Sequence, residues 1–167
     1  VLAMANKPTF DPNIFVSFQA QKERQKVLQS ETTLLNRAIR GRYPPGSTLK
    51  MIGAIAAVET GITDTLSTFA ACVGSLQVGD VVFRCNNRSG HGELNLLEAI
   101  ETSCNTYFHH LAQLMGIEIW REYAEKFGLG RRTGLVFEPG EYEGLLPCRQ
   151  YYQERDGWTL GHLLNLI

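Results

Sequence analysis

The sequence predicts an α/β (α+β) fold of which this chain holds a mainly helical portion. Three stretches carry apolar residues at helical spacing, namely 47–58, 95–115 and 117–127. A short hairpin is expected at 76–84, and a further strand is expected at 134–137. Helices therefore outweigh strands in the predicted structure.

The composition is that of an ordinary folded domain. The 167 residues are typical of a single domain that buries its own core. Apolar residues make up 44% and charged residues 20%, which excludes a disordered or collagen-like chain. The 16 Lys and Arg residues balance 17 Asp and Glu residues, so no basic excess indicates nucleic acid or an anionic membrane surface. The longest apolar run, Met51 to Val58, is far shorter than the roughly 20 residues of a membrane span.

The helix that starts near Ser47 is expected to be central. Pro44 and Pro45 cannot lie inside a helix, and they precede Ser47 directly. Small and apolar residues then alternate to Val58, which predicts burial on most sides. Gly61 suits the residue after the helix end.

The other elements are predicted from prolines, glycines and breaks in the helical pattern. Residues 6–17 contain two prolines and are expected to form an extended loop, whereas 19–29 have helical character. The predicted hairpin turns at Gly79-Asp80, and the helical pattern of 95–115 is interrupted around 103–105. Residues 138–157 are rich in Gly and Glu and are expected to be loop. Three aromatic residues with helical spacing are expected in the core, namely Trp120, Tyr123 and Phe127.

Ser47 and Lys50 form a candidate nucleophile and base. Side chains three residues apart share one face of a helix, so the lysine amine can reach the serine hydroxyl. Serine needs a base to act as a nucleophile, and lysine serves as one only when its pKa is lowered. The helix start also offers a free backbone N–H to a developing oxyanion.

A Ser-x-x-Lys motif alone is weak support, because a helix cap followed by a solvated lysine gives the same pattern. Ser103 and Asn105 strengthen the interpretation, since they lie at the interruption between two predicted helices. A serine hydroxyl there can relay a proton, and an amide can hold a substrate carbonyl or amide.

The chain resembles the transpeptidase domain of class B penicillin-binding proteins, and most closely the elongation-type group, penicillin-binding protein 2. The superfamily carries Ser-x-x-Lys, a Ser-x-Asn-like motif and Lys-Thr-Gly. The residues that carry the resemblance are Asp11-Pro12-Asn13-Ile14-Phe15, Leu35-Asn36-Arg37-Ala38, YPPGSTLK at 43–50, Gly90-His91-Gly92, SCNTYF at 103–108, Phe127-Gly128-Leu129-Gly130 and Thr133-Gly134.

The resemblance implies a penicillin-binding/β-lactamase-like fold and a peptidoglycan D,D-transpeptidase. Ser47 would be the acylated nucleophile, Lys50 its base, Ser103 a proton relay and Asn105 the residue that positions the substrate amide. Stem peptides ending in D-Ala-D-Ala would be the substrate, and β-lactams would acylate the same serine. A lipid-linked glycan polymerase of the elongation machinery is an implied partner.

The chain departs from the family pattern in one respect, because it contains no Lys-Thr-Gly. Residues 1–167 are therefore expected to be a partial transpeptidase domain without the membrane anchor, the N-terminal pedestal and the Lys-Thr-Gly strand. The parent protein is expected in the bacterial inner membrane with its catalytic domain in the periplasm. The strand supplies the second oxyanion donor, and loss of one such donor costs about 10²–10³ in rate. We expect the chain alone to be inactive or nearly so.

Three cysteines and a histidine form a candidate metal centre. Their pattern is Cys-x₁₂-Cys-x₅-His-x₁₂-Cys, and Cys₃His is a common ligand set of tetrahedral zinc. The relatives carry Asp, Asp, His and Cys at what look like the same places, so the resemblance implies a structural zinc ion. The predicted ligands are Cys72, Cys85, His91 and Cys104.

Other interpretations stay open. A disulfide between Cys72 and Cys85 suits an oxidising periplasm, and free buried thiols are a further possibility. Cys148 has no partner in either scheme and is expected to be a loop or packing residue. For function, the alternatives are a β-lactam-sensing or non-catalytic zinc-stabilised scaffold, or a serine β-lactamase or D,D-carboxypeptidase.

Overall fold

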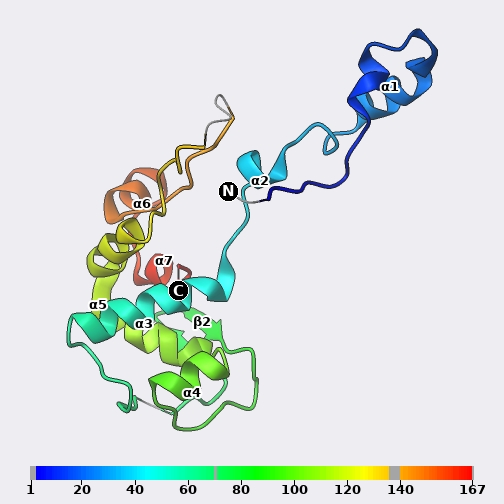
Figure 1. Ribbon diagram of the computed structural model, residues 1–167. Helices are drawn as coiled ribbons and strands as arrows, with labels where there is room; N and C mark the ends of the chain where they lie inside the picture. The colour runs from blue at the N-terminus through cyan, green and yellow to red at the C-terminus, as the bar shows by residue number, and fades with distance from the viewer. Residues whose placement is uncertain (1–2, 70, 136–139, 167) are drawn as a thin grey trace. The chain divides into compact units, whose positions relative to one another are not determined.

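The computed structural model describes residues 3–69, 71–135 and 140–166. The chain forms two compact units, Val1–Tyr43 with Arg132–Gly144, and Pro44–Arg131 with Leu145–Ile167. Figure 1 labels most of the elements. Their bounds are η1 Pro12–Phe15, η2 Phe18–Ala20, α1 Gln21–Gln29, α2 Arg37–Arg40, η3 Gly46–Leu49, α3 Lys50–Glu59, β1 Ser75–Val78, β2 Val81–Arg84, α4 Leu96–Glu101, α5 Asn105–Lys126, α6 Arg149–Arg155 and α7 Leu160–Leu164.

The first unit contains α1, as its helical character predicts, but residues 6–17 are not entirely an extended loop. They include the 3₁₀ helix η1, which has Pro12 at its first position. Asp11 caps this turn, because its carboxylate accepts a hydrogen bond from the backbone N–H of Asn13 at 2.9 Å. Pro12 therefore starts a short helix in this segment.

The helix predicted to start near Ser47 begins as the 3₁₀ turn η3 and continues as α3. Its end is confirmed at Gly61, which has a φ of 72°. The N–H of Gly61 donates to Val58 and that of Ile62 donates to Ala57, so the last carbonyls of α3 are paired. A residue with a Cβ atom would be strained in this left-handed conformation.

The predicted hairpin is confirmed. Strands β1 and β2 pair antiparallel, with Val78 opposite Val81 and Ser75 opposite Arg84. Gly79 has a φ of 59° and begins the two-residue turn. Phe83 points into the core from the middle of β2.

The interruption predicted around 103–105 separates α4 from α5. Asn95 caps α4 through a reciprocal pair of hydrogen bonds with Glu98. Helix α5 is broken once more at Gly116, whose φ of 77° and ψ of 166° are not helical. The expected third helix, 117–127, is thus the second half of α5.

The core of the second unit forms where α3, α4 and α5 meet (Figure 1). Ala54 and Ala57 of α3 are small enough to let α3 approach Phe108 and Leu111 of α5 closely. Trp120 and Tyr123 are buried as predicted, but Phe127 is 54% exposed, so that prediction was wrong. Phe127 lies at the C-cap of α5, where the helix has already left the core.

The segment 138–157 was expected to be loop, yet α6 begins at Arg149. This helix buries Tyr152, which stacks on His162 of α7 with ring centroids 4.2 Å apart. The sequence did not predict this helix, because the segment is mostly polar and one buried aromatic residue gives no periodic pattern. The strand expected at 134–137 falls mostly outside the described residues, and residues 134 and 135 are not in a strand.

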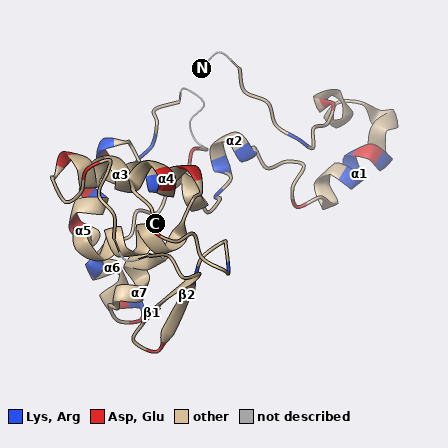
Figure 2. Cartoon of the chain, turned by 90° about the horizontal axis from the view of Figure 1, so that it is seen from below, with Lys and Arg blue, Asp and Glu red and all other residues tan. Residues whose placement is uncertain are grey.

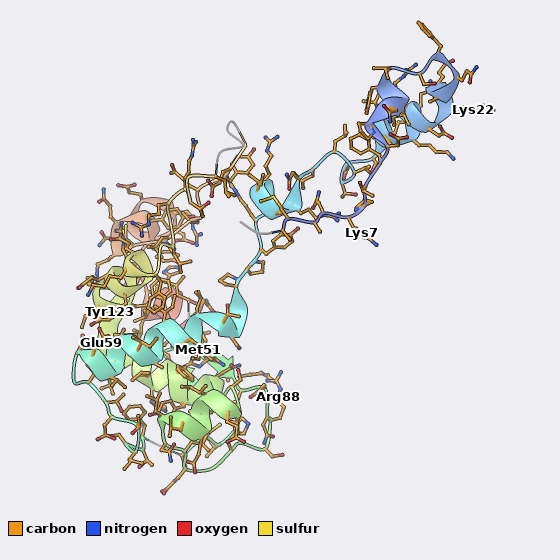
Figure 3. All side chains as sticks on the ribbon, in the orientation of Figure 1. Lys7, Lys22, Met51, Glu59, Arg88 and Tyr123 are labelled. Carbon is orange, nitrogen blue, oxygen red and sulfur yellow. The ribbon has the colours of Figure 1, made fainter. Side chains whose placement is uncertain are left out.

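Charged residues of both signs are interspersed along the described chain (Figure 2). Met51 of α3, Glu59 at the end of α3 and Tyr123 of α5 are marked in Figure 3. Met51 is half exposed, so α3 is not covered on every side. Among the described residues, no helix combines the length and the hydropathy needed to cross a membrane.

Burial of α5 against α3 predicts a specific stability difference. Leu111 is fully buried, whereas Leu114 on the same helix is 58% exposed. We expect Leu111→Ala to lower the free energy of unfolding by about 2–5 kcal/mol, because it leaves a cavity in the core. The matched variant Leu114→Ala should change it by less than about 0.5 kcal/mol. Urea unfolding of both variants measures the difference, and equal effects would contradict this packing.

Candidate active site and metal centre

The amine of Lys50 joins α3 to the segment between α4 and α5. Its Nζ atom donates to the carbonyl oxygen of Ser103 at 2.7 Å, to Ser103 Oγ at 3.0 Å and to Asn105 Oδ1 at 2.6 Å. The ring of Phe108 lies 5.5 Å away from the same nitrogen. The structure therefore brings together Lys50, Ser103 and Asn105, three of the four residues predicted to act on substrate.

Ser47 lies on η3, one turn before Lys50, and is exposed. The hydrogen bond expected between Ser47 and Lys50 is absent from the described part of the chain, because the three donors of Lys50 are directed at Ser103 and Asn105. Residues three apart align in a 3₁₀ turn, but here Ser47 is exposed whereas Lys50 is buried. Catalytic hydrogen bonds are often loose without a substrate, and the role of Ser47 stays a prediction.

Burial lowers the pKa of Lys50 below its usual 10.5, while Cys104 and Cys85 nearby act in the opposite direction. The side chain is only 4% exposed, although it is cationic when protonated. Three acceptors match the three donors of an ammonium group. The geometry thus describes the charged form, and burial makes loss of its proton easier than in water.

The Ser103–Asn105 segment is held in an unusual conformation. Ser103 has a φ of 52°, the one positive value among the described non-glycine residues. Asn105 Nδ2 donates to the carbonyl of Arg84 at 3.1 Å, so both ends of its amide are engaged. Because strained backbone persists only where its surroundings fix it, these contacts preset the side chains that face Lys50.

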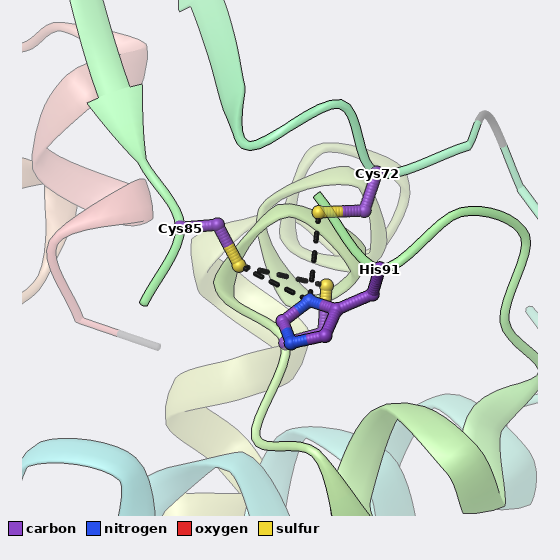
Figure 4. Close-up of side chains that lie close together, drawn as sticks. Cys72, Cys85 and His91 are labelled. Carbon is purple, nitrogen blue, oxygen red and sulfur yellow. Dashed lines mark hydrogen bonds between the residues drawn. The ribbon is translucent and has the colours of Figure 1, made fainter. Parts of the chain in front are cut away.

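Cys104, which lies between Ser103 and Asn105, belongs to a cluster of four potential ligands. The ligand atoms of Cys72, Cys85, His91 and Cys104 all lie within 4.8 Å of one another. Figure 4 shows Cys72, Cys85 and His91 converging from separate segments. His91 Nδ1 lies 3.7 Å from Cys72 Sγ and 3.5 Å from Cys85 Sγ, and Cys85 Sγ lies 3.8 Å from Cys104 Sγ.

These distances fit a tetrahedral zinc ion. With Zn–S near 2.3 Å and Zn–N near 2.0–2.1 Å, tetrahedral ligands lie about 3.8 Å apart for two sulfurs and about 3.6 Å apart for sulfur and nitrogen. The three cysteine sulfurs are buried and the imidazole is half-buried. A closed Cys₃His set of this kind is typical of structural zinc.

Local backbone geometry brings the ligands together. Cys72 and Gly92 form an antiparallel bridge, with hydrogen bonds of 2.8 and 3.1 Å, and this places His91 beside Cys72. Gly90 permits the approach, because a Cβ atom there would lie 2.0 Å from the carbonyl oxygen of Cys72. Cys104 is the N-cap of α5, and its sulfur accepts from the N–H of Tyr107 at 3.5 Å.

The thiols differ in acidity before any cation binds. Burial raises the pKa of Cys104 to about 12. Burial also opposes ionisation of Cys72, but hydrogen bonds, including those from His91, lower its pKa to about 6. A divalent cation would have to displace the Cys104 proton, as is usual for thiolate ligands.

All four cysteines are free, so the Cys72–Cys85 disulfide considered from the sequence is not present. Cys85 Sγ instead lies 3.8 Å from Cys104 Sγ. Cys148 lies outside the cluster, and its sulfur accepts from the N–H of Tyr151 at 3.4 Å as the N-cap of α6.

Asn86 is a site residue that the sequence did not reveal. Its Nδ2 donates to the carbonyl of Thr102 at 3.1 Å, and its Oδ1 accepts from Cys85 at 3.1 Å. It thus links the cluster of potential ligands around Cys85 to the segment that contacts Lys50. An asparagine in a polar loop carries no distinguishing pattern, and its place directly after Cys85 was the one available signal.

Comparison with known proteins identifies the family. The sequence matches the family described as penicillin binding protein transpeptidase domain over residues 1–161. The chain belongs to this family. The resemblance to class B penicillin-binding proteins of the elongation type, and with it the predicted fold, is confirmed by the relatives.

One relative of this transpeptidase domain is the peptidoglycan D,D-transpeptidase MrdA of Acinetobacter baumannii, 34% identical over 170 residues, which cover 99% of this chain and 25% of the relative. The structure of Pseudomonas aeruginosa PBP2 in complex with WCK 5153 matches with a TM-score of 0.86 and 36% identity, over 99% of this chain and 38% of that chain. A peptidoglycan synthase complex matches with a TM-score of 0.82 and 33% identity, over 97% and 28%. The chain spans about a quarter of the length of the curated relatives, at 25% and 27% of two of them.

Proposed function

We propose that this chain is the nucleophile-bearing part of a serine D,D-transpeptidase that cross-links peptidoglycan stem peptides. The observation that carries the proposal is the buried amine of Lys50, bonded to Ser103 and Asn105 one turn after Ser47. A buried lysine next to a serine is a recognised way to activate the hydroxyl. Membership of the transpeptidase family supports the same reaction class.

The proposed reaction has two acyl-transfer steps. Ser47 Oγ attacks the carbonyl carbon of the penultimate D-Ala, and Lys50 takes the hydroxyl proton. The peptide C–N bond then breaks, and the terminal D-Ala leaves with a proton relayed through Ser103 Oγ, which lies 3.0 Å from Lys50 Nζ. In the second step the amine of a neighbouring stem attacks the ester and returns the serine. A β-lactam would acylate the same hydroxyl.

Asn105 is proposed to position the substrate amide. Its own amide is oriented by Lys50 on one side and by the Arg84 carbonyl on the other. The substrate would therefore meet a group that is already fixed, which reduces the entropy lost on reaching the transition state. The backbone N–H of Ser47 in the first turn of η3 is the proposed oxyanion donor.

We further propose that Cys72, Cys85, His91 and Cys104 hold a structural zinc ion. Bound zinc would tie the hairpin and the His91 loop to the N-terminus of α5, directly behind Ser103 and Asn105. The protein is proposed to act in the elongation machinery at the outer face of the bacterial inner membrane. The related peptidoglycan synthase complex, which coordinates polymerization and crosslinking, supports a glycan polymerase as a partner of this protein.

The test is formation of cross-linked dimers from stem peptides by the full-length protein. We expect Ser47→Ala to abolish both cross-linking and labelling by a fluorescent penicillin. Ser17→Ala is the control, since the Ser17 side chain makes no capping hydrogen bond. Acylation without any cross-linked product would favour a β-lactam sensor, and release of D-Ala alone would favour a carboxypeptidase. The 167-residue chain contains no Lys-Thr-Gly. Fluorescent penicillin is expected to label it about 10²–10³-fold more slowly than the full-length protein.

A further inference from the structure

The cysteine cluster holds a pair of thiols close enough to react with each other. Cys85 Sγ and Cys104 Sγ are 3.8 Å apart, and Cys72 Sγ lies within 4.8 Å of both. Cys85 lies directly after strand β2, and Cys104 is the N-cap of α5. The two sulfurs therefore belong to different segments of the chain, which meet in one core cluster.

We propose that Cys85 and Cys104 are an oxidation site, at which a small peroxide forms a disulfide, expels the metal and displaces the Ser103–Asn105 segment. The proposal rests on the zinc ion proposed above only for the metal-release step. The disulfide requires a thiol at both positions, because a carboxylate ligand could not form this bond. The pair also differs from the Cys72–Cys85 bridge considered from the sequence.

The reaction balances with hydrogen peroxide as the oxidant. One of the two sulfurs attacks a peroxide oxygen and becomes a sulfenic acid, and the O–O bond breaks to release the first water after protonation. The second sulfur then attacks the sulfenic sulfur, the S–O bond breaks, and a second water leaves. Two thiols are oxidised to one disulfide while one peroxide is reduced to two waters.

Geometry links this disulfide to the active site. An S–S bond is about 2.05 Å long, so the two sulfurs must approach by about 1.8 Å. Cys104 lies between Ser103 and Asn105, which contact Lys50 at 2.6–3.0 Å. The part of this approach that falls on the backbone of Cys104 shifts its two neighbours and lengthens their hydrogen bonds to Lys50. Oxidation is therefore expected to separate Lys50 from the groups it contacts.

Burial limits which oxidants can act. Cys85 is 1% exposed and Cys104 is 0% exposed, whereas His91 is half-buried and lies where the cluster meets solvent. We expect a molecule as small as peroxide to reach the sulfurs past the imidazole, and a bulky aromatic disulfide to be excluded. The expected selectivity for small oxidants distinguishes this pair from an exposed thiol such as those of typical redox sensors.

The experiment treats the purified full-length protein with hydrogen peroxide and follows two signals. A chromogenic chelator measures zinc release, and peptide mapping by mass spectrometry identifies cross-linked cysteines. We expect zinc release together with a Cys85–Cys104 cross-link, both reversed by dithiothreitol and added zinc. Cys72→Asp should still give the cross-link, whereas Cys85→Asp, which keeps a metal-ligating side chain, should not. Labelling of Ser47 by penicillin should fall and recover in parallel.

The outcomes separate the two proposals. A protein that holds no zinc but forms the Cys85–Cys104 cross-link supports the oxidation site and overturns the zinc centre. A zinc-loaded protein that forms no cross-link, or one joined through Cys72, overturns the oxidation site and leaves the zinc centre standing. Rapid reaction of the folded protein with an aromatic disulfide at Cys85 would also overturn the proposal.

Discussion

Replacing Lys50 with arginine is expected to lower acylation of Ser47 by penicillin about 10²–10⁴-fold, the usual contribution of a general base. Arginine keeps the positive charge and the hydrogen-bond donors, but it does not lose its proton in proteins. A lysine that serves only to hold Ser103 and Asn105 would therefore be replaced well by arginine. The measurement is the rate of fluorescent-penicillin labelling of the full-length protein.

The control for this experiment is Lys126→Arg. Lys126 is exposed on the last turn of α5 and pairs with Glu122. Its replacement should leave the labelling rate unchanged. Thermal unfolding of both variants checks that Lys50→Arg still folds. Labelling of Lys50→Arg at a rate close to that of the parent protein would contradict a role for Lys50 as base.

The rate at which Ser47 is acylated should depend on pH. The neutral amine is the active form of Lys50, so the acylation rate should rise with pH. Because burial lowers the pKa of Lys50, the rise should level off below pH 10.5, its usual pKa. A labelling rate that does not change with pH would contradict deprotonation of Lys50 as part of the reaction.

Removal of the proposed zinc ion is expected to have the largest effect on stability. Structural zinc sites contribute folding free energy directly, about 10–16 kcal/mol in small zinc-finger peptides. The ligands here connect the hairpin, the His91 loop and the start of α5, so their release should loosen the core cluster that contains them. A loss of even about 3 kcal/mol would lower Tm by roughly 6–12 °C for a chain of this size.

Elemental analysis of the reduced protein should find one zinc ion per chain, and a strong chelator should lower Tm. Cys85→Ser should lose the metal. Cys148→Ser should keep it, because Cys148 caps α6 away from the cluster. Reduced protein that has never met a chelator and contains no metal would contradict the zinc proposal, as would equal effects of the two substitutions.

Much of the local structure could be predicted from the sequence, because it depends on neighbouring residues. Gly61 ends α3 and Gly79 turns the hairpin, since both positions need a positive φ that glycine adopts freely. The break at Ser103 was equally visible as an interruption of helical periodicity. In contrast, α6 was missed because its mostly polar sequence has no apolar period. Phe127 was wrongly placed in the core because it continues the helical spacing of Trp120 and Tyr123 beyond the point where α5 leaves the core.

The residue types available at the site follow from the amino-acid sequence: a serine and a lysine one turn apart, a second serine with an asparagine, and four potential metal ligands. Which of them come into contact depends on the tertiary structure. Packing of α3 against α5 directs Lys50 to Ser103 and Asn105 rather than to Ser47. The Cys72–Gly92 bridge and the hairpin bring Cys85 to Cys104. Such contacts join positions 19 to 55 residues apart, and no local propensity encodes a distance across the core.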